Sequence, residues 1–152
     1  MVVNQPQLLN QRRGLDFGAG FYLTTREDQA KGFATTVVNR RKMGVPTISV
    51  YDFDESKAND ALEILTFLEA DASWLEFVRD NRLKTYSGKQ YDLIIGPVAN
   101  DRVFPTLQAL AIGQFSVEAA LVALRPYKLF DQYCLSSERA LSLLRFLNCT
   151  VD

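Results

Sequence analysis

Asp16-Phe17-Gly18-Ala19-Gly20-Phe21-Tyr22-Leu23 is the stretch that decides the fold, because it places two glycines among three aromatic residues. Glycine inside a strand-like run favours close approach by another backbone or by a ligand, since glycine has no Cβ. Just downstream, Thr25 is a predicted helix N-cap, and Asp28 stands in capping-box spacing to it. The helix is expected to run to about Lys42, and Gly44 is expected to end it.

Strand-like segments and a further helix follow this opening. Residues 45–53 are rich in β-branched and aromatic residues and predict a strand. The alternation over 62–68 permits either a strand or a helix. We favour the strand, because Asp71 then offers an N-cap for an amphipathic helix over 72–82. Residues 91–96 form a short apolar run that ends in Gly-Pro, which predicts a buried strand.

The last third of the chain continues this mixture of elements. The pattern predicts helices over 102–112 and 116–124 separated by Gly113, a strand over 132–135, a short helix capped by Ser137, and a closing strand over 146–151. Strands and helices alternate without a regular βαβ pattern, so we expect an α+β fold around a split antiparallel sheet with flanking helices. The length of 152 residues fits one domain, 1–152.

The composition excludes several classes of function. Acidic and basic residues nearly balance, with a net charge of −1, so there is no basic surplus for gripping nucleic acid, although a local basic patch stays open. The chain contains no histidine, which excludes a histidine triad, a histidine general base and a histidine metal site. No metal is expected.

The cysteines and the apolar runs bear on location. Cys134 and Cys149 lie in apolar segments and have no metal-ligand spacing, so we expect two buried thiols in a reducing compartment. No apolar run reaches the roughly 20 residues that span a bilayer. The first residues also lack the pattern of a signal peptide. We therefore expect a cytoplasmic protein without a membrane partner.

Three motifs carry a resemblance to a known family. They are the segments 15–25, 91–102 and 131–134, the last followed by Glu138-Arg139-Ala140-Leu141. In this order they resemble the bacterial family catalogued as domain of unknown function 3990, from about Val3 to the C-terminus. The glycine segment also resembles the Gly-x-Gly-(Ile/Phe)-Tyr motif in the poly-ADP-ribose polymerase branch of ADP-ribosyltransferases. The resemblance implies an NAD-binding cleft in a split β-fold of that type and transfer of ADP-ribose to a target.

The same resemblance assigns roles to residues of the first motif. Tyr22 would stack on the nicotinamide ring with its flat aromatic face, and Phe21 belongs to the same binding segment. Gly18 and Gly20 would let the backbone approach NAD closely, and NAD would serve as substrate. The remaining candidates on the NAD side are Thr24 and Thr25, which would hydrogen-bond ribose or shape the cleft, and Arg13, which would meet the pyrophosphate or lie in a plain surface loop.

Gln132 falls where the resembled transferases place their catalytic glutamate. Cleavage of the nicotinamide–ribose bond passes through an oxocarbenium-like state, which a carboxylate stabilises and a glutamine stabilises less. The loss of one such preorganised contact costs on the order of 3 kcal/mol, so both a slow transferase and an inactive one stay open. Asp101 could supply the missing carboxylate, or Asn100 and Asp101 could cap the helix that begins near Arg102.

The resembled families also carry a His-Gly strand ahead of the segment that matches Val3 to Pro6. We expect either that this sequence begins after that strand or that this member has dispensed with it. The resemblance implies an NAD-dependent transferase, plausible as a toxin or defence component that modifies a protein or nucleic acid, beside a small neutralising partner protein. The alternative is a catalytically inactive domain of the same fold that binds a nucleotide or another protein.

Overall fold

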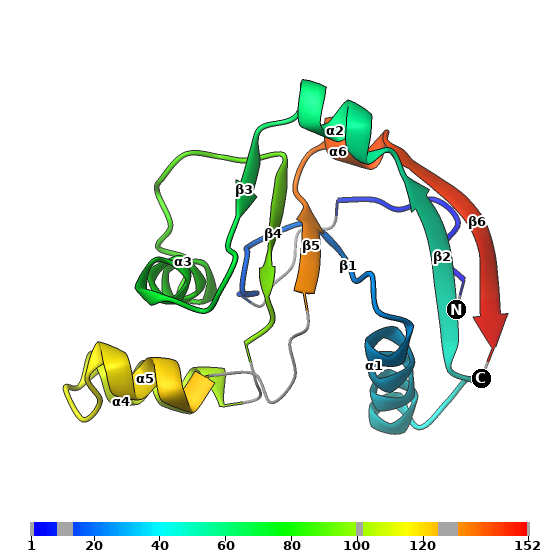
Figure 1. Ribbon diagram of the computed structural model, residues 1–152. Helices are drawn as coiled ribbons and strands as arrows, with labels where there is room; N and C mark the ends of the chain where they lie inside the picture. The colour runs from blue at the N-terminus through cyan, green and yellow to red at the C-terminus, as the bar shows by residue number, and fades with distance from the viewer. Residues whose placement is uncertain (1, 9–13, 100–101, 125–130, 152) are drawn as a thin grey trace.

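The computed structural model describes residues 2–8, 14–99, 102–124 and 131–151. Figure 1 shows a central sheet, a smaller two-stranded sheet beside it, and helices around both. The strands are β1 (Phe21–Leu23), β2 (Thr47–Phe53), β3 (Ile64–Thr66), β4 (Leu93–Pro97), β5 (Asp131–Leu135) and β6 (Leu144–Val151). The helices are α1 (Glu27–Arg41), α2 (Glu55–Ala61), α3 (Ala72–Arg82), α4 (Val103–Ala111), α5 (Val117–Leu124) and α6 (Glu138–Leu141). The expected α+β class is confirmed.

The central sheet is mixed, so the expectation of an antiparallel core was wrong for the β3–β4 pair. Its four strands lie in the order β1-β5-β4-β3; β5 is antiparallel to both of its neighbours, whereas β3 and β4 are parallel. The reason is the connection, because α3 lies between β3 and β4 in the sequence and returns the chain to the starting end of the sheet. The last strand also differs from the expectation, since β6 pairs with β2 in the separate sheet.

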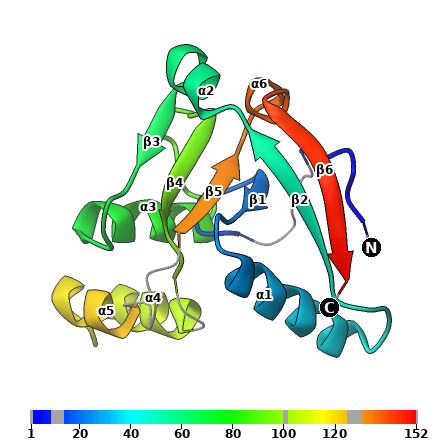
Figure 2. The same cartoon turned by 45° about the vertical axis from the view of Figure 1, so that its right-hand side comes forward.

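Aromatic contacts join the small sheet to the central one. The rings of Phe21 on β1 and Tyr51 on β2 lie 5.8 Å apart, edge to face, and Tyr51 meets Phe146 of β6 at 5.8 Å. The Tyr51 hydroxyl also donates to the carbonyl of Val3, whose amide donates to Ser49 Oγ at 3.0 Å. The N-terminal segment therefore contacts β2, and in Figure 2 it lies beside the small sheet of β2 and β6.

The central sheet has two buried faces, because successive side chains of a strand point to opposite sides. The α3 face carries Ile94 and Cys134 and packs against α3, α4 and α5. The α2 face carries Leu93 and Leu135 and packs against α6 and residues beside α2. The core thus consists of two clusters separated by the sheet, and a residue's place in its strand decides which cluster it joins.

The start of α1 differs from the predicted capping box. Arg26, not Thr25, is the N-cap, and no side chain caps the helix there. The hydroxyl of Thr24 accepts from the Arg26 amide at 3.1 Å and donates to Gln29 at 2.7 Å. Asp28 pairs with Arg26 at 3.1 Å. The threonine one position earlier therefore organises the turn that Thr25 was expected to organise.

The predictions for the other helix ends were confirmed for α3 and α6 and wrong for the end of α1. Asp71 accepts from the Trp74 amide at 2.9 Å and begins α3 as predicted. Ser137 begins α6 in the same way. The end of α1 is set by Lys42 in a left-handed conformation (φ 54°), two residues before the expected Gly44.

Cys149 is exposed on β6, so the prediction of two buried thiols holds for Cys134 alone.

No helix within the described ranges is both long and apolar enough to cross a membrane.

Candidate functional site

The carboxylate of Asp16 lies at the centre of the candidate site and is only 4% exposed. One oxygen accepts from Arg82 Nε at 2.7 Å and pairs with Arg82 Nη2 at 2.6 Å. The other accepts from the Ala99 amide at 3.1 Å and from Gln132 Nε2 at 3.2 Å. A buried charge is tolerated only with partners of this kind. Asp16 therefore ties the glycine segment to α3, to the end of β4 and to β5.

Arg82 extends this connection beyond Asp16. Its guanidinium donates to the carbonyl of Gly14 at 3.2 Å and lies 5.1 Å from the centre of the Phe104 ring. The planar fork of arginine suits such simultaneous contacts, which a lysine ammonium reproduces poorly. The last residue of α3 thus holds both the start of the glycine segment and the first turn of α4.

Gln132 is the second residue of β5 and is 8% exposed. Its partner across the sheet is Gly96 of β4, and its side chain points to the α3 face. A carboxylate can only accept hydrogen bonds, so Asp16 fixes the amide nitrogen of Gln132 toward itself. The structure therefore brings Gln132 to the glycine segment, and Asp16 holds its amide in one orientation.

Tyr22 lies on the same face and anchors the glycine turn. It faces Cys134 across the β1–β5 pair. Its hydroxyl donates to the carbonyl of Gly18 at 2.7 Å and accepts from the Phe17 amide at 3.1 Å. Burial raises the pKa of the Tyr22 hydroxyl, and the nearby Cys134 thiol raises it further. Its hydroxyl is therefore neutral at any physiological pH.

The two glycines of the motif are required by close approach within the protein. A Cβ on Gly20 would lie 2.5 Å from Cys134 Sγ and 2.8 Å from the carbonyl oxygen of Leu135. Gly18 has a φ of 82°, and a Cβ there would meet Asn81 Oδ1 at 2.6 Å. The sequence left open whether another backbone or a ligand approaches Gly20. In the structure it is the backbone of Leu135.

Three other candidates on the NAD side lie apart from this cluster. Phe21 points to the α2 face, opposite to Tyr22, and packs edge to face on Tyr51. Thr24 is half-buried at the start of α1, and Thr25 is exposed. Arg13 and Asp101, the candidates for the pyrophosphate and for a second carboxylate, lie outside the described residues, as does Asn100.

A pocket of about 180 Å³ lies against the glycine segment. Its lining comprises Phe17, Gly18, Ala19, Phe77, Asn81, Tyr86, Lys89, Gln90, Tyr91, Ile94 and Ser136. Lys89 is its cationic group; the ammonium lies 5.5 Å from the centre of the Tyr91 ring and 2.7 Å from Glu63. The pocket thus combines the glycine segment, aromatic rings and hydrogen-bond donors.

Asp16 is the residue that sequence reasoning missed, although it stands in the deciding stretch. The only local signal was an acidic residue before a run of aromatics and glycines, and its partner Gln132 is 116 positions away. Among the described residues, no group of three or more cysteine, aspartate or glutamate side chains is placed to hold a metal ion.

Comparison with known proteins places the chain in a family. No curated protein matches it, and no solved structure matches it. A family model described as "Protein of unknown function (DUF3990)" matches residues 1–146, which is nearly the whole chain. The chain therefore belongs to the DUF3990 family.

Proposed function

We propose that this domain is an ADP-ribosyltransferase-like protein that binds NAD beside the glycine segment and transfers ADP-ribose to a protein or nucleic acid. The observation that supports the proposal is the convergence of the separate motifs. The β1–β5 pair brings Tyr22 and Gln132 to one face, and Asp16 of the first motif binds Gln132 of the last. The end of β4, in the middle motif, meets the same carboxylate through the Ala99 amide.

The pocket beside Gly18 and Ala19 offers contacts that suit a dinucleotide. Lys89 and Asn81 can donate to a pyrophosphate or a ribose, and the rings of Tyr86 and Tyr91 offer surfaces for a flat base. The Lys89–Glu63 pair is exposed, so an incoming phosphate can replace Glu63 at small cost.

Gln132 would hold a ribose hydroxyl or the reacting bond without supplying charge. Stabilisation of an oxocarbenium-like state would then be weaker than with a carboxylate, by on the order of 3 kcal/mol, and transfer would be slow. In this proposal Asp16 keeps the Gln132 amide in one orientation and does not itself touch the substrate.

A specific observation favours a second candidate, a catalytically inactive binding domain of the same type. The hydroxyl of Tyr22 and the amide nitrogen of Gln132 are both bound inside the protein. A domain of this kind would bind NAD or ADP-ribose without turnover, or would bind another protein. A role as a bacterial toxin or defence component in the cytoplasm, with a small neutralising protein as partner, belongs to the first candidate and rests on the resemblance of the motifs.

The deciding experiment is incubation of the chain with labelled NAD, with nicotinamide release, label transfer and calorimetric binding as readouts. The variants are Gln132→Ala, Lys89→Ala and Tyr22→Phe, because the last keeps the ring and removes only the hydroxyl. Turnover that disappears in Gln132→Ala supports the transferase. Binding without turnover that is weakened in Lys89→Ala supports the binding domain. Neither turnover nor binding contradicts the transferase and the nucleotide-binding domain, and leaves a domain that binds another protein.

A further inference from the structure

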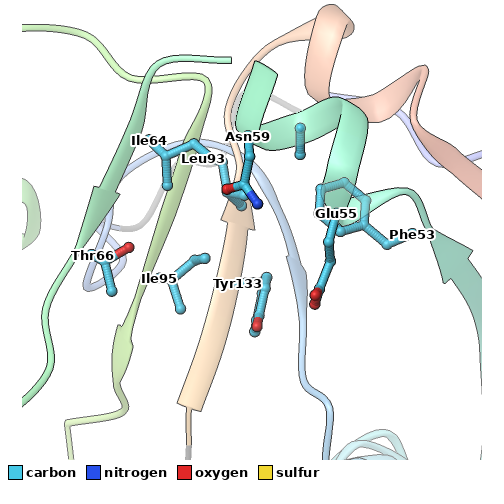
Figure 3. Close-up of a pocket in the computed structure, with 9 residues that line it drawn as sticks. Phe53, Glu55, Asn59, Ile64, Thr66, Leu93, Ile95 and Tyr133 are labelled. Carbon is cyan, nitrogen blue, oxygen red and sulfur yellow. The ribbon is translucent and has the colours of Figure 1, made fainter. Parts of the chain in front are cut away.

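A second pocket, of about 150 Å³, lies on the α2 face of the sheet (Figure 3). Its lining comprises Phe53, Glu55, Ala58, Asn59, Ile64, Thr66, Leu93, Ile95 and Tyr133. It is separate from the candidate NAD site, because Gln132 and Tyr133 are neighbours on β5 and their side chains point to opposite faces of the sheet. A ligand here would not touch the Asp16 cluster.

The floor of this pocket carries three aliphatic residues and Thr66, and its sides carry two aromatic residues. Ile64, Leu93 and Ile95 come from the parallel β3–β4 pair, where Ile64 lies directly beside Leu93. Phe53 ends β2 and Tyr133 lies on β5, so aromatic rings reach the pocket from both sheets. A cavity of similar size lined by aliphatic and aromatic residues accepts a benzene-sized molecule. The pocket therefore suits a compact group.

Glu55 gives the pocket its charge. It is the only ionised residue in the lining, and no lysine or arginine within the described ranges forms an ion pair with it. Figure 3 shows its carboxylate beside Tyr133 at the mouth of the pocket. Burial raises the pKa of the Tyr133 hydroxyl, and the negative charges of Glu55 and Asp131 raise it further. Glu55 and Asp131 therefore both place negative charge near Tyr133.

We propose that the α2-face pocket binds the head group of a small organic cation of the alkylammonium class. A cation is attracted by the faces of aromatic rings within about 6 Å and by an unpaired carboxylate. The aliphatic residues of the floor accept methyl groups.

Choline and 3,3-dimethyl-1-butanol are the probes, because they share one shape and differ in the charged nitrogen. Each is titrated into the full chain and followed by the NMR shifts of Leu93, Ile95 and Tyr133. We expect saturable shifts with choline, and binding of the neutral alcohol weaker by about tenfold or more, within the range of a desolvated cation–π contact plus a carboxylate. Equal binding of both probes, or no saturable shift with choline in the millimolar range, overturns the proposal.

Matched variants separate the charge from the rings. Glu55→Gln removes the carboxylate from an exposed position, and Glu76→Gln removes one from the exposed side of α3. We expect choline binding to weaken about fivefold or more in the first and to stay unchanged in the second. Tyr133→Phe keeps the ring and should keep binding, whereas Tyr133→Leu should lose it. If Tyr133→Leu does not fold, unchanged choline binding in Glu55→Gln still overturns the proposal.

Discussion

The side chain of Gln132 donates to the carboxylate of Asp16 at 3.2 Å inside the protein, so a buried carboxylate already lies beside position 132. A glutamate at 132 would place a second carboxylate against the first. A glutamine at position 132 therefore suits the neighbouring Asp16, since an amide can donate a hydrogen bond to it and a carboxylate cannot. This relationship leads to the first prediction.

Gln132→Glu should lower the free energy of unfolding by on the order of 3 kcal/mol at neutral pH, because two buried carboxylates would share one site. The pKa of the new carboxyl should rise above its ordinary value in the folded state. The loss should therefore be small below about pH 4, where the glutamate is protonated in both states. It should grow as the pH rises and level off above the raised pKa. Urea unfolding across this pH range measures it.

The control is the double variant Asp16→Asn with Gln132→Glu, which exchanges the amide and the carboxylate. Its asparagine can donate to the glutamate, so stability should recover in part and the pH dependence should flatten. If Gln132→Glu and the unchanged protein have the same free energy of unfolding at every pH, Asp16 does not fix the orientation of residue 132.

Arg82→Met should destabilise the fold by about 3–5 kcal/mol, because it leaves the buried carboxylate of Asp16 without its cation. The matched control on the same helix is Arg79→Met, whose partner Asp80 is about a third exposed. That change should cost at most about 1 kcal/mol. Denaturant midpoints compare the two. Similar midpoints for both variants would show that the Asp16 pair contributes no more than a surface pair.

Gly20→Ala should destabilise the fold by about 1–3 kcal/mol or more, because the added methyl would meet Cys134 and the backbone of Leu135 on β5. Gly32 in α1 is the matched control, since a Cβ there meets nothing within 4 Å. Gly32→Ala should stabilise the fold by up to about 1 kcal/mol through helix propensity. Thermal unfolding of both variants gives the comparison, and opposite signs are expected. A destabilised Gly32→Ala would contradict the exposed placement of that residue.

The elements that local chemistry specifies were predictable. Residues 72–82 have a capping aspartate before them and an apolar face, and α3 matches the prediction at both ends. The strands β2 and β4 follow from β-branched and apolar runs and lie within the predicted ranges to within about two residues.

The elements that depend on distant partners were not predictable. No prediction covered α2, because its sequence Glu-Ser-Lys-Ala-Asn-Asp-Ala has one buried residue, Ala58, and no apolar period. The parallel pairing of β3 with β4 arises from their connection through α3, and composition does not indicate such a pairing. The candidate site depends on Asp16 meeting Arg82 and Gln132, over separations of 66 and 116 residues. The pattern of a single stretch contains none of these contacts.

The two cysteines should differ sharply in reactivity toward a thiol reagent. Cys149 is exposed on β6, whereas Cys134 is fully buried between β1 and β4, and burial raises the pKa of the Cys134 thiol. Since the thiolate is the reactive form, Cys149 should be modified rapidly at pH 8 and Cys134 only when the domain unfolds. The measurement is the time course of labelling for Cys149→Ser and Cys134→Ser. Rapid labelling of Cys149→Ser in native buffer would mean that β5 opens without global unfolding. Labelling at the rate of unfolding in denaturant would assign β5 to the most stable part of the fold.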